Sequence, residues 1–186
     1  MYSLGNRDGS QIDYNADAQF LQMVLKRKEV EYDVRLIKAT EIPSWIKDDY
    51  NGTLPLLTYE NKTIGNALEA AYILERSIPK NSLLRVSGVS VEEALNRTSN
   101  FFDIVTRYIL NKDHTLELEY RENVMKELDK IDELIRSTPG KYLCGIDVTI
   151  ADLYMLPRFF QAVIGLEHFK KTTIFHMDND VERPVF

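Results

Sequence analysis

The chain has little sulfur or histidine chemistry to offer. Its 186 residues include one cysteine, Cys144, and three histidines. A single cysteine excludes an intramolecular disulfide, a thiolate metal cluster and a two-cysteine redox pair within one chain. The histidines lie far apart in the sequence, without acidic or cysteine partners at ligand spacing, so we expect no metal site. This composition fits a reducing compartment, and we expect a cytoplasmic protein.

A basic surface and a long apolar run are also missing. The net charge is -6, with 29 acidic against 23 basic residues, so nothing favours binding to nucleic acid or anionic lipid. No segment approaches the roughly 20 apolar residues of a membrane-spanning helix, and the N-terminus lacks the layout of a signal peptide. Nucleic acid is therefore excluded as an expected partner, and membrane association is left open only as peripheral contact.

What is present predicts two differently built halves. In the first half, short strand-like and helix-like segments alternate. A helix is predicted from the spacing of Phe20, Leu21, Val24 and Leu25, and alternation predicts a strand over residues 30–37. The segments "LPLLTYE" and "KTI" predict a hairpin, and a helix then begins at the amide cap Asn66. The expected order is strand, helix, strand, helix, strand, strand, helix.

The second half is predicted to be wholly helical. We therefore expect an α/β domain over residues 1–79, a linker over 80–88 and a helical domain over 89–186. The last helix, "VTIADLYMLPRFFQAVIGL", is apolar nearly all round, which is typical of a buried central helix. It begins at a capping box, in which Thr149 is followed three residues later by Asp152.

With this order of elements, the segment "GIDVTIADLYMLP" resembles the capped central helix of the glutathione transferase superfamily. The resemblance implies a thioredoxin-like α/β N-terminal domain and an all-α C-terminal domain, apparently shortened at both ends. The loop "NGTLPLL" is similar to the one that carries the superfamily's cis-proline, which would be Pro55. Within the superfamily, "DGSQIDYNADAQFLQMVLKRKEVEY" and "TIADLYMLPRF" resemble the chloride intracellular channel (CLIC) family most.

The resembled family has a reactive cysteine at the start of the first helix, where this chain has Asn15. An amide is not a nucleophile, whereas asparagine is a strong N-cap. Asp17, in the first turn, suits the helix dipole but would raise the pKa of a nearby thiol. We therefore predict no catalytic residue at this position.

The remaining glutathione groove is predicted from the same resemblance. Its residues would be Asn15, Leu54, Pro55, Gly65 and Asn66, with Gly65 where transferases usually carry serine. Backbone amides at a helix N-terminus still suit a carboxylate, so weak glutathione binding is left open, and no cofactor is required.

These features give three hypotheses about function. The leading one is a non-catalytic binding or scaffold protein, a pseudoenzyme. The alternative is a divergent glutathione transferase or glutathione-dependent reductase that uses the hydroxyl of Tyr14, Tyr2 or Ser3. Chloride channel activity is implied by the family resemblance alone, and the charged residues between Lys26 and Arg35 oppose insertion into a bilayer. The short helical domain predicts a protein partner or homodimer that covers it.

Overall fold

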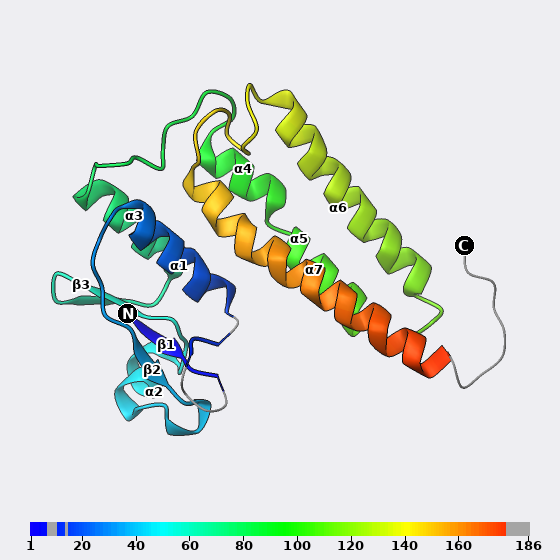
Figure 1. The fold of residues 1–186 in the computed structure, drawn as a ribbon, viewed down its shortest axis with the longest axis horizontal. Helices are drawn as coiled ribbons and strands as arrows, with labels where there is room; N and C mark the ends of the chain where they lie inside the picture. The colour runs from blue at the N-terminus through cyan, green and yellow to red at the C-terminus, as the bar shows by residue number, and fades with distance from the viewer. Residues whose placement is uncertain (7–10, 14, 178–186) are drawn as a thin grey trace.

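The structure, a computed structural model, describes residues 1–6, 11–13 and 15–177. Figure 1 shows a small α/β part beside a group of long helices. The elements of the first part are β1 (Tyr2–Leu4), α1 (Ala16–Arg27), β2 (Arg35–Ile37), the 3-10 helix η1 (Ala39–Glu41), α2 (Ser44–Tyr50), β3 (Leu57–Tyr59), β4 (Lys62–Ile64) and α3 (Ala67–Ser77). Those of the second part are α4 (Val91–Thr98), α5 (Phe101–Leu110), α6 (Glu117–Ser137) and α7 (Ile150–Met177).

The strands of the first part follow the spatial order β2, β1, β3, β4. β1 pairs with β2 in parallel, and β3 pairs with β4 antiparallel. Between these two pairs, Tyr2 and Leu56 exchange backbone hydrogen bonds of 2.8 and 2.9 Å. The strand predicted over residues 30–37 is shorter than expected, because its pairing with β1 covers only Arg35 to Ile37.

Helix α1 packs its apolar stripe into the core, as the sequence predicted. The four stripe residues are each at most 1% exposed: Phe20, Leu21, Val24 and Leu25. The stripe faces both α3 and α7, so α1 is shared by the two parts of the molecule. Burial of one such side chain contributes about 1.5–3 kcal/mol. The boundaries predicted at residues 79 and 89 remain a prediction.

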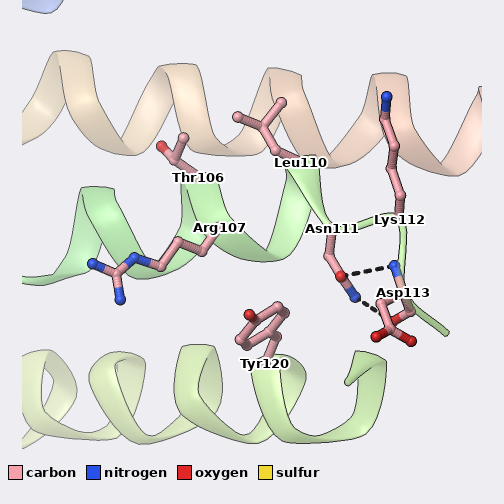
Figure 2. A pocket seen from close by; sticks show the side chains of 7 residues that line it. All are labelled: Thr106, Arg107, Leu110, Asn111, Lys112, Asp113 and Tyr120. Atoms are coloured by element: carbon pink, nitrogen blue, oxygen red, sulfur yellow. Dashed lines mark hydrogen bonds between the residues drawn. The ribbon is translucent and has the colours of Figure 1, made fainter. Parts of the chain in front are cut away.

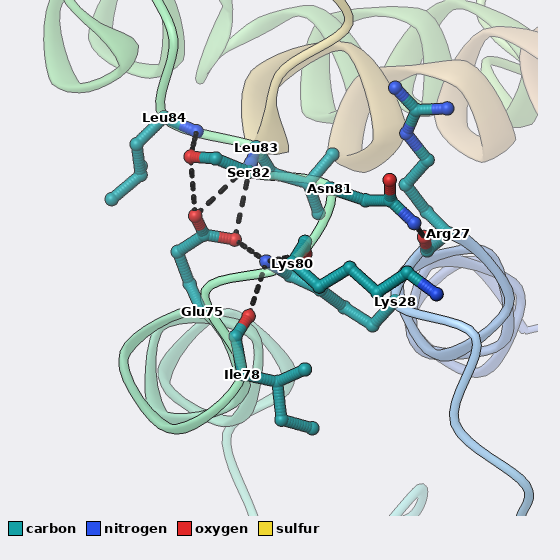
Figure 3. Close-up of polar contacts among 9 residues, drawn as sticks. All are labelled: Arg27, Lys28, Glu75, Ile78, Lys80, Asn81, Ser82, Leu83 and Leu84. Carbon is teal, nitrogen blue, oxygen red and sulfur yellow. Dashed lines mark hydrogen bonds and ion pairs between the residues drawn. The ribbon is translucent and has the colours of Figure 1, made fainter.

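A buried ion pair joins the C-terminal ends of α1 and α3. Lys28 follows the last turn of α1, and its ammonium group pairs with the Glu75 carboxylate (Figure 3). The same ammonium donates to the carbonyl oxygens of Ile78 at 2.9 Å and Lys80 at 3.0 Å. The lysine side chain is fully buried, so these contacts replace the water that it loses.

Glu75 also fixes the segment that leads to the helical part. Its carboxylate accepts hydrogen bonds from the Ser82 hydroxyl at 2.7 Å and from the Leu83 amide at 3.1 and 3.2 Å (Figure 3). The carbonyl of Leu83 in turn accepts a bond from the amide of Ile150, the first residue of α7. One carboxylate therefore connects α1, α3 and the start of α7.

The composition of helix α7 predicted a helix that is buried on all sides. This prediction is wrong for one face of the helix. Ile150, Ala151 and Met155 are buried against the neighbouring helices. Four apolar side chains on another face are instead between 43% and 57% exposed: Leu156, Phe160, Val163 and Ile164. The partner or second copy predicted from the short helical domain would lie here, and it remains a prediction.

Candidate functional site

The register of the sheet brings three of the predicted groove residues, Leu54, Pro55 and Asn66, to one edge. The Leu54–Pro55 peptide bond is cis. Leu57 pairs with Ile64, so continuing the β3–β4 register places Pro55 opposite Asn66. The bridge between Tyr2 and Leu56 places Pro55 beside β1 as well. The cis-proline thus lies between the strand that leads to α1 and the start of α3.

Helices α1 and α3 begin at this same edge. Lys28 and Glu75 join their C-terminal ends, so α1 and α3, of 12 and 11 residues, run parallel and begin at the same end. Each begins at an asparagine cap. Asn15 Oδ1 accepts from the Ala18 amide, and Asn66 Oδ1 accepts from the Glu69 amide, both at 2.9 Å. The other backbone amides of each first turn have no partner within the helix, so they can stabilise an anion at this end.

Gly65 is closely packed against the ring of Tyr50. A Cβ atom at this position would lie 3.1 Å from Cδ1 of the Tyr50 ring and 3.5 Å from Cδ2 of Leu56. Tyr50 is held in place by a 3.2 Å hydrogen bond from its hydroxyl to the carbonyl of Thr63. A serine at this position would therefore require the Tyr50 ring to shift by a few tenths of an ångström.

Asp17 has a partner that the sequence did not indicate. Its Oδ1 accepts a 2.6 Å hydrogen bond from Arg158 Nη2, which comes from α7, 141 residues away. The guanidinium lies 3.4 Å from the centre of the Tyr154 ring and donates to the Tyr154 carbonyl at 2.8 Å. Arg158 therefore offsets the negative charge at the start of α1 and ties α1 to the helical part.

Two of the three alternative hydroxyl donors, Ser3 and Tyr2, are engaged in packing away from the groove. Ser3 is 1% exposed, and its hydroxyl has no hydrogen-bond partner among the described residues. The Tyr2 ring packs edge-on against Trp45 at 5.3 Å, and its hydroxyl accepts from Arg35 at 3.4 Å. Tyr14 lies outside the described residues. Ser3 and Tyr2 therefore do not supply the nucleophile-activating group considered from the sequence.

The single cysteine lies elsewhere, next to the capping box of α7. Cys144 is 1% exposed, and burial raises the pKa of its thiol, against a lowering hydrogen bond with Thr149. Asp152 Oδ2 accepts from both the amide (2.8 Å) and the hydroxyl (2.7 Å) of Thr149, and its Oδ1 accepts from the Leu143 amide at 2.8 Å. These hydrogen bonds hold the start of α7 in place, and the buried Cys144 thiol is not accessible to a substrate.

The helical part carries a wide groove and a smaller cavity. A wide groove of about 500 Å³ lies between the end of α5 and the start of α6, and Figure 2 shows Arg107, Lys112 and Tyr120 along it. A smaller cavity of about 180 Å³ lies between α5 and α7 and includes Gln161. Among the residues that the structure describes, no group of three or more histidine, cysteine, aspartate or glutamate side chains could hold a metal ion.

The chain resembles known glutathione transferases in sequence. No protein-family profile matches it. It is 27% identical over 163 residues to "Probable glutathione S-transferase DHAR1, cytosolic" of Oryza sativa subsp. japonica, covering 85% of this chain and 73% of that protein. It is 23% identical over 166 residues to glutathione S-transferase DHAR2 of Arabidopsis thaliana, covering 87% and 75%.

Solved structures agree on the fold. Dehydroascorbate reductase of Chlamydomonas reinhardtii superposes with a TM-score of 0.75 at 18% identity, covering 91% of this chain and 78% of that one. Glutathione transferase Omega 3C of Trametes versicolor gives 0.71 at 18% identity, covering 83% and 72%. The chain has the glutathione transferase fold. The predicted thioredoxin-like region followed by helices is thereby confirmed.

The comparisons support only the coarser part of the sequence-based interpretation. They support the glutathione transferase superfamily, with relatives of the DHAR and omega kinds, and give no support to the chloride intracellular channel family or to a non-catalytic role. In the described part of the chain, no helix is both long and apolar enough to cross a membrane.

Proposed function

We propose that this chain binds glutathione and catalyses a glutathione-dependent transfer or reduction, in which the thiol of glutathione itself is the nucleophile. The observation that carries the proposal is the meeting of cis-Pro55 with the capped starts of α1 and α3 at one edge. The relatives and the structural neighbours are glutathione transferases and a dehydroascorbate reductase, which supports the choice of ligand.

The groups at this edge suit the parts of the tripeptide. The first-turn amides of α3 and the Asn66 cap suit a carboxylate. The backbone at Leu54, before the cis bond, suits an extended peptide ligand that pairs as a strand does. In this arrangement the thiol of glutathione lies beside the start of α1. The helix dipole and the side-chain amide of Asn15 stabilise its thiolate form there.

Arg158 removes the main electrostatic objection to a thiolate at this place. The sequence suggested that Asp17 would raise the pKa of a nearby thiol. Arg158 pairs with that carboxylate at 2.6 Å, so the start of α1 carries little net negative charge. The chemistry then needs no protein cysteine, which agrees with the burial of Cys144, the single cysteine of the chain.

Turnover assays test this proposal. The purified chain is mixed with glutathione and either 1-chloro-2,4-dinitrobenzene or dehydroascorbate, whose reduction consumes two glutathione molecules and yields their disulfide. We expect turnover that falls in Asn15→Ala and is unchanged in Cys144→Ser. Turnover that disappears in a folded Cys144→Ser variant would contradict the proposal.

A second candidate is glutathione binding without chemistry. It is favoured by one observation, namely that Oδ1 of Asn15 is already used as a helix cap. Binding of glutathione without turnover on either substrate would support this candidate in place of the first.

A further inference from the structure

Helix α6 has a second apolar face besides the one that packs against α4 and α5. Its packed face includes Val124, Ile131 and Leu134, which are at most 6% exposed. Four further apolar side chains of the same helix are between 36% and 66% exposed: Leu118, Met125, Leu128 and Ile135. Figure 1 shows α6 on the outer side of the helical part, so this second face is open to a partner.

This second face follows a heptad spacing. Six residues lie along it at alternating steps of three and four positions: Leu118, Arg121, Met125, Leu128, Asp132 and Ile135. We call these six residues the α6 stripe. Side chains at this spacing line one side of a helix, and two such helices can pack along their stripes as a coiled coil. The stripe is about 26 Å long, since each residue adds about 1.5 Å to a helix.

Two opposite charges are set into the stripe. Arg121 is exposed, and the side chain of Asp132 is 58% exposed. The two residues lie about 16 Å apart along the helix, so they do not pair with each other. Asp132 instead forms a 2.8 Å ion pair with Arg136, one turn further on. An apolar partner would desolvate Arg121 without a counter-charge, so a fitting partner carries an acid opposite Arg121 and a base opposite Asp132.

The stripe is its own complement when it is reversed. Read in either direction, its residues are apolar, charged, apolar, apolar, charged and apolar, and the reversal exchanges the two charges. A second α6 that lies antiparallel, with a two-fold axis between residues 126 and 127, therefore places Arg121 of each copy opposite Asp132 of the other. The apolar side chains meet as well: Met125 with Leu128, and Leu118 with Ile135. A two-fold interface needs such self-complementarity, whereas a different protein would not require it.

The exposed face of α7 lacks this pattern. Between Leu156 and Ile164 the one charged residue is Arg158, which pairs with Asp17 of the same chain. No pair of opposite charges in this stretch of the sequence defines the orientation of a second copy. The α6 stripe therefore specifies a second copy, and the exposed face of α7 does not.

We infer that the α6 stripe mediates a homodimer in which two α6 helices pack antiparallel. The inference does not rest on the proposed function, because the stripe lies outside the edge at which α1 and α3 begin. Contact through one helix face gives a small interface, and interfaces below roughly 1,200 Å² in total are weak or transient. The dimer should therefore form at micromolar or higher protein concentration and dissociate on dilution.

Charge reversal tests whether Arg121 and Asp132 face each other. Arg121→Glu places a carboxylate opposite Asp132, and Asp132→Arg places a guanidinium opposite Arg121. Each variant alone should have a dissociation constant at least about tenfold above that of the wild type. An equimolar mixture of the two should dimerise again, because each copy then meets the opposite charge in the other. Sedimentation velocity over a range of concentrations measures each constant. A mixture that stays as monomeric as its two components would overturn the inference.

A matched control separates this pairing from an effect of net charge. Lys126→Glu changes the net charge as much as Arg121→Glu does, but residue 126 lies on another side of α6, outside the stripe. It should leave the dissociation constant of the dimer unchanged. Equal effects of these two variants, or a wild-type chain that is monomeric at millimolar concentration, would contradict the inference.

Cross-linking tests the antiparallel direction. In the antiparallel pair the two copies of residue 125 lie about 4.5 Å apart along the axis, and the two copies of residue 118 lie about 26 Å apart. A short bismaleimide should therefore cross-link Met125→Cys and leave Leu118→Cys monomeric. The native Cys144 is buried, so it should not react. Cross-linking of Leu118→Cys, or failure to cross-link Met125→Cys, would show that the two helices do not pack in this way.

Discussion

The two ends of the α1–α3 helix pair treat polar groups in opposite ways. At the C-terminal ends, Lys28 and Glu75 are buried and bonded to the chain itself. At the N-terminal ends, asparagine caps satisfy one amide each, and the Asp17 carboxylate of the pair with Arg158 stays 42% exposed. The C-terminal ends, which we call the closed end, stabilise the fold. The N-terminal ends, which we call the open end, are more exposed, and there we place the proposed ligand.

The largest effect should come from breaking the closed end. Lys28→Met leaves the Glu75 carboxylate buried without its counter-charge, and we expect a loss of about 3–5 kcal/mol in the free energy of unfolding, measured with urea. The double variant Lys28→Met/Glu75→Leu should recover most of this loss, because an apolar pair replaces the ion pair. If the free energy of unfolding of Lys28→Met lay within about 1 kcal/mol of the wild-type value, the ion pair would not stabilise this end as we expect.

The same pair should make stability depend on pH. Burial acts to raise the pKa of Glu75, but hydrogen bonds from Lys28, Ser82 and Leu83 outweigh it, so the pKa lies below the ordinary 4.5. A lowered pKa gives stability that is full above the unfolded-state pKa and is lost as the pH falls through the folded-state pKa. The stability advantage of the wild type over Glu75→Gln should therefore shrink between pH 6 and pH 3. A stability advantage that grows toward acid pH would contradict a lowered pKa of Glu75.

A smaller effect is expected at the open end. Asn15→Ala removes the cap of α1 and should cost about 1 kcal/mol in the free energy of unfolding. Ser90→Ala removes the corresponding 3.1 Å cap bond of α4 and should cost about the same. Calorimetric titration with glutathione should then distinguish them, with weaker binding in Asn15→Ala and unchanged binding in Ser90→Ala. Equal affinities in the two variants would remove Asn15 from the site.

The smallest change in stability should follow loss of the charge pair between α1 and α7. Arg158→Gln should change the free energy of unfolding by at most about 1 kcal/mol, since Asp17 is partly exposed and screened. Its effect on chemistry should be larger, because the unpaired Asp17 carboxylate then raises the pKa of the bound thiol. We expect the rise of turnover with pH to move to higher pH, and the double variant Asp17→Asn/Arg158→Gln to reverse that movement.

Local patterns predicted much of this architecture. The apolar spacing of Phe20, Leu21 and Val24 predicted a buried helix face, and the alternating segments predicted the β3–β4 hairpin. The extent of β2 was overestimated, because alternation in residues 30–34 does not supply a neighbouring strand. The exposed face of α7 was also missed, because composition does not tell how many neighbours a helix has.

Less of the site could be predicted, because some of its contacts join residues that are far apart in the sequence. Asn15, Pro55 and Asn66 could be named because caps and the cis-proline loop have local signatures. Arg158 could not, since its partner Asp17 is 141 residues away and either residue alone reads as an ordinary surface charge.

The most direct test of the account is a titration of the wild-type chain with glutathione, followed by backbone amide NMR. We predict saturable shifts at Leu54, Asn66 and the first turn of α1, with the signals of Lys28 and Ile78 at the closed end unchanged. Shifts confined to the closed end, or to the groove between α5 and α6, would contradict the assignment of the open end as the glutathione site.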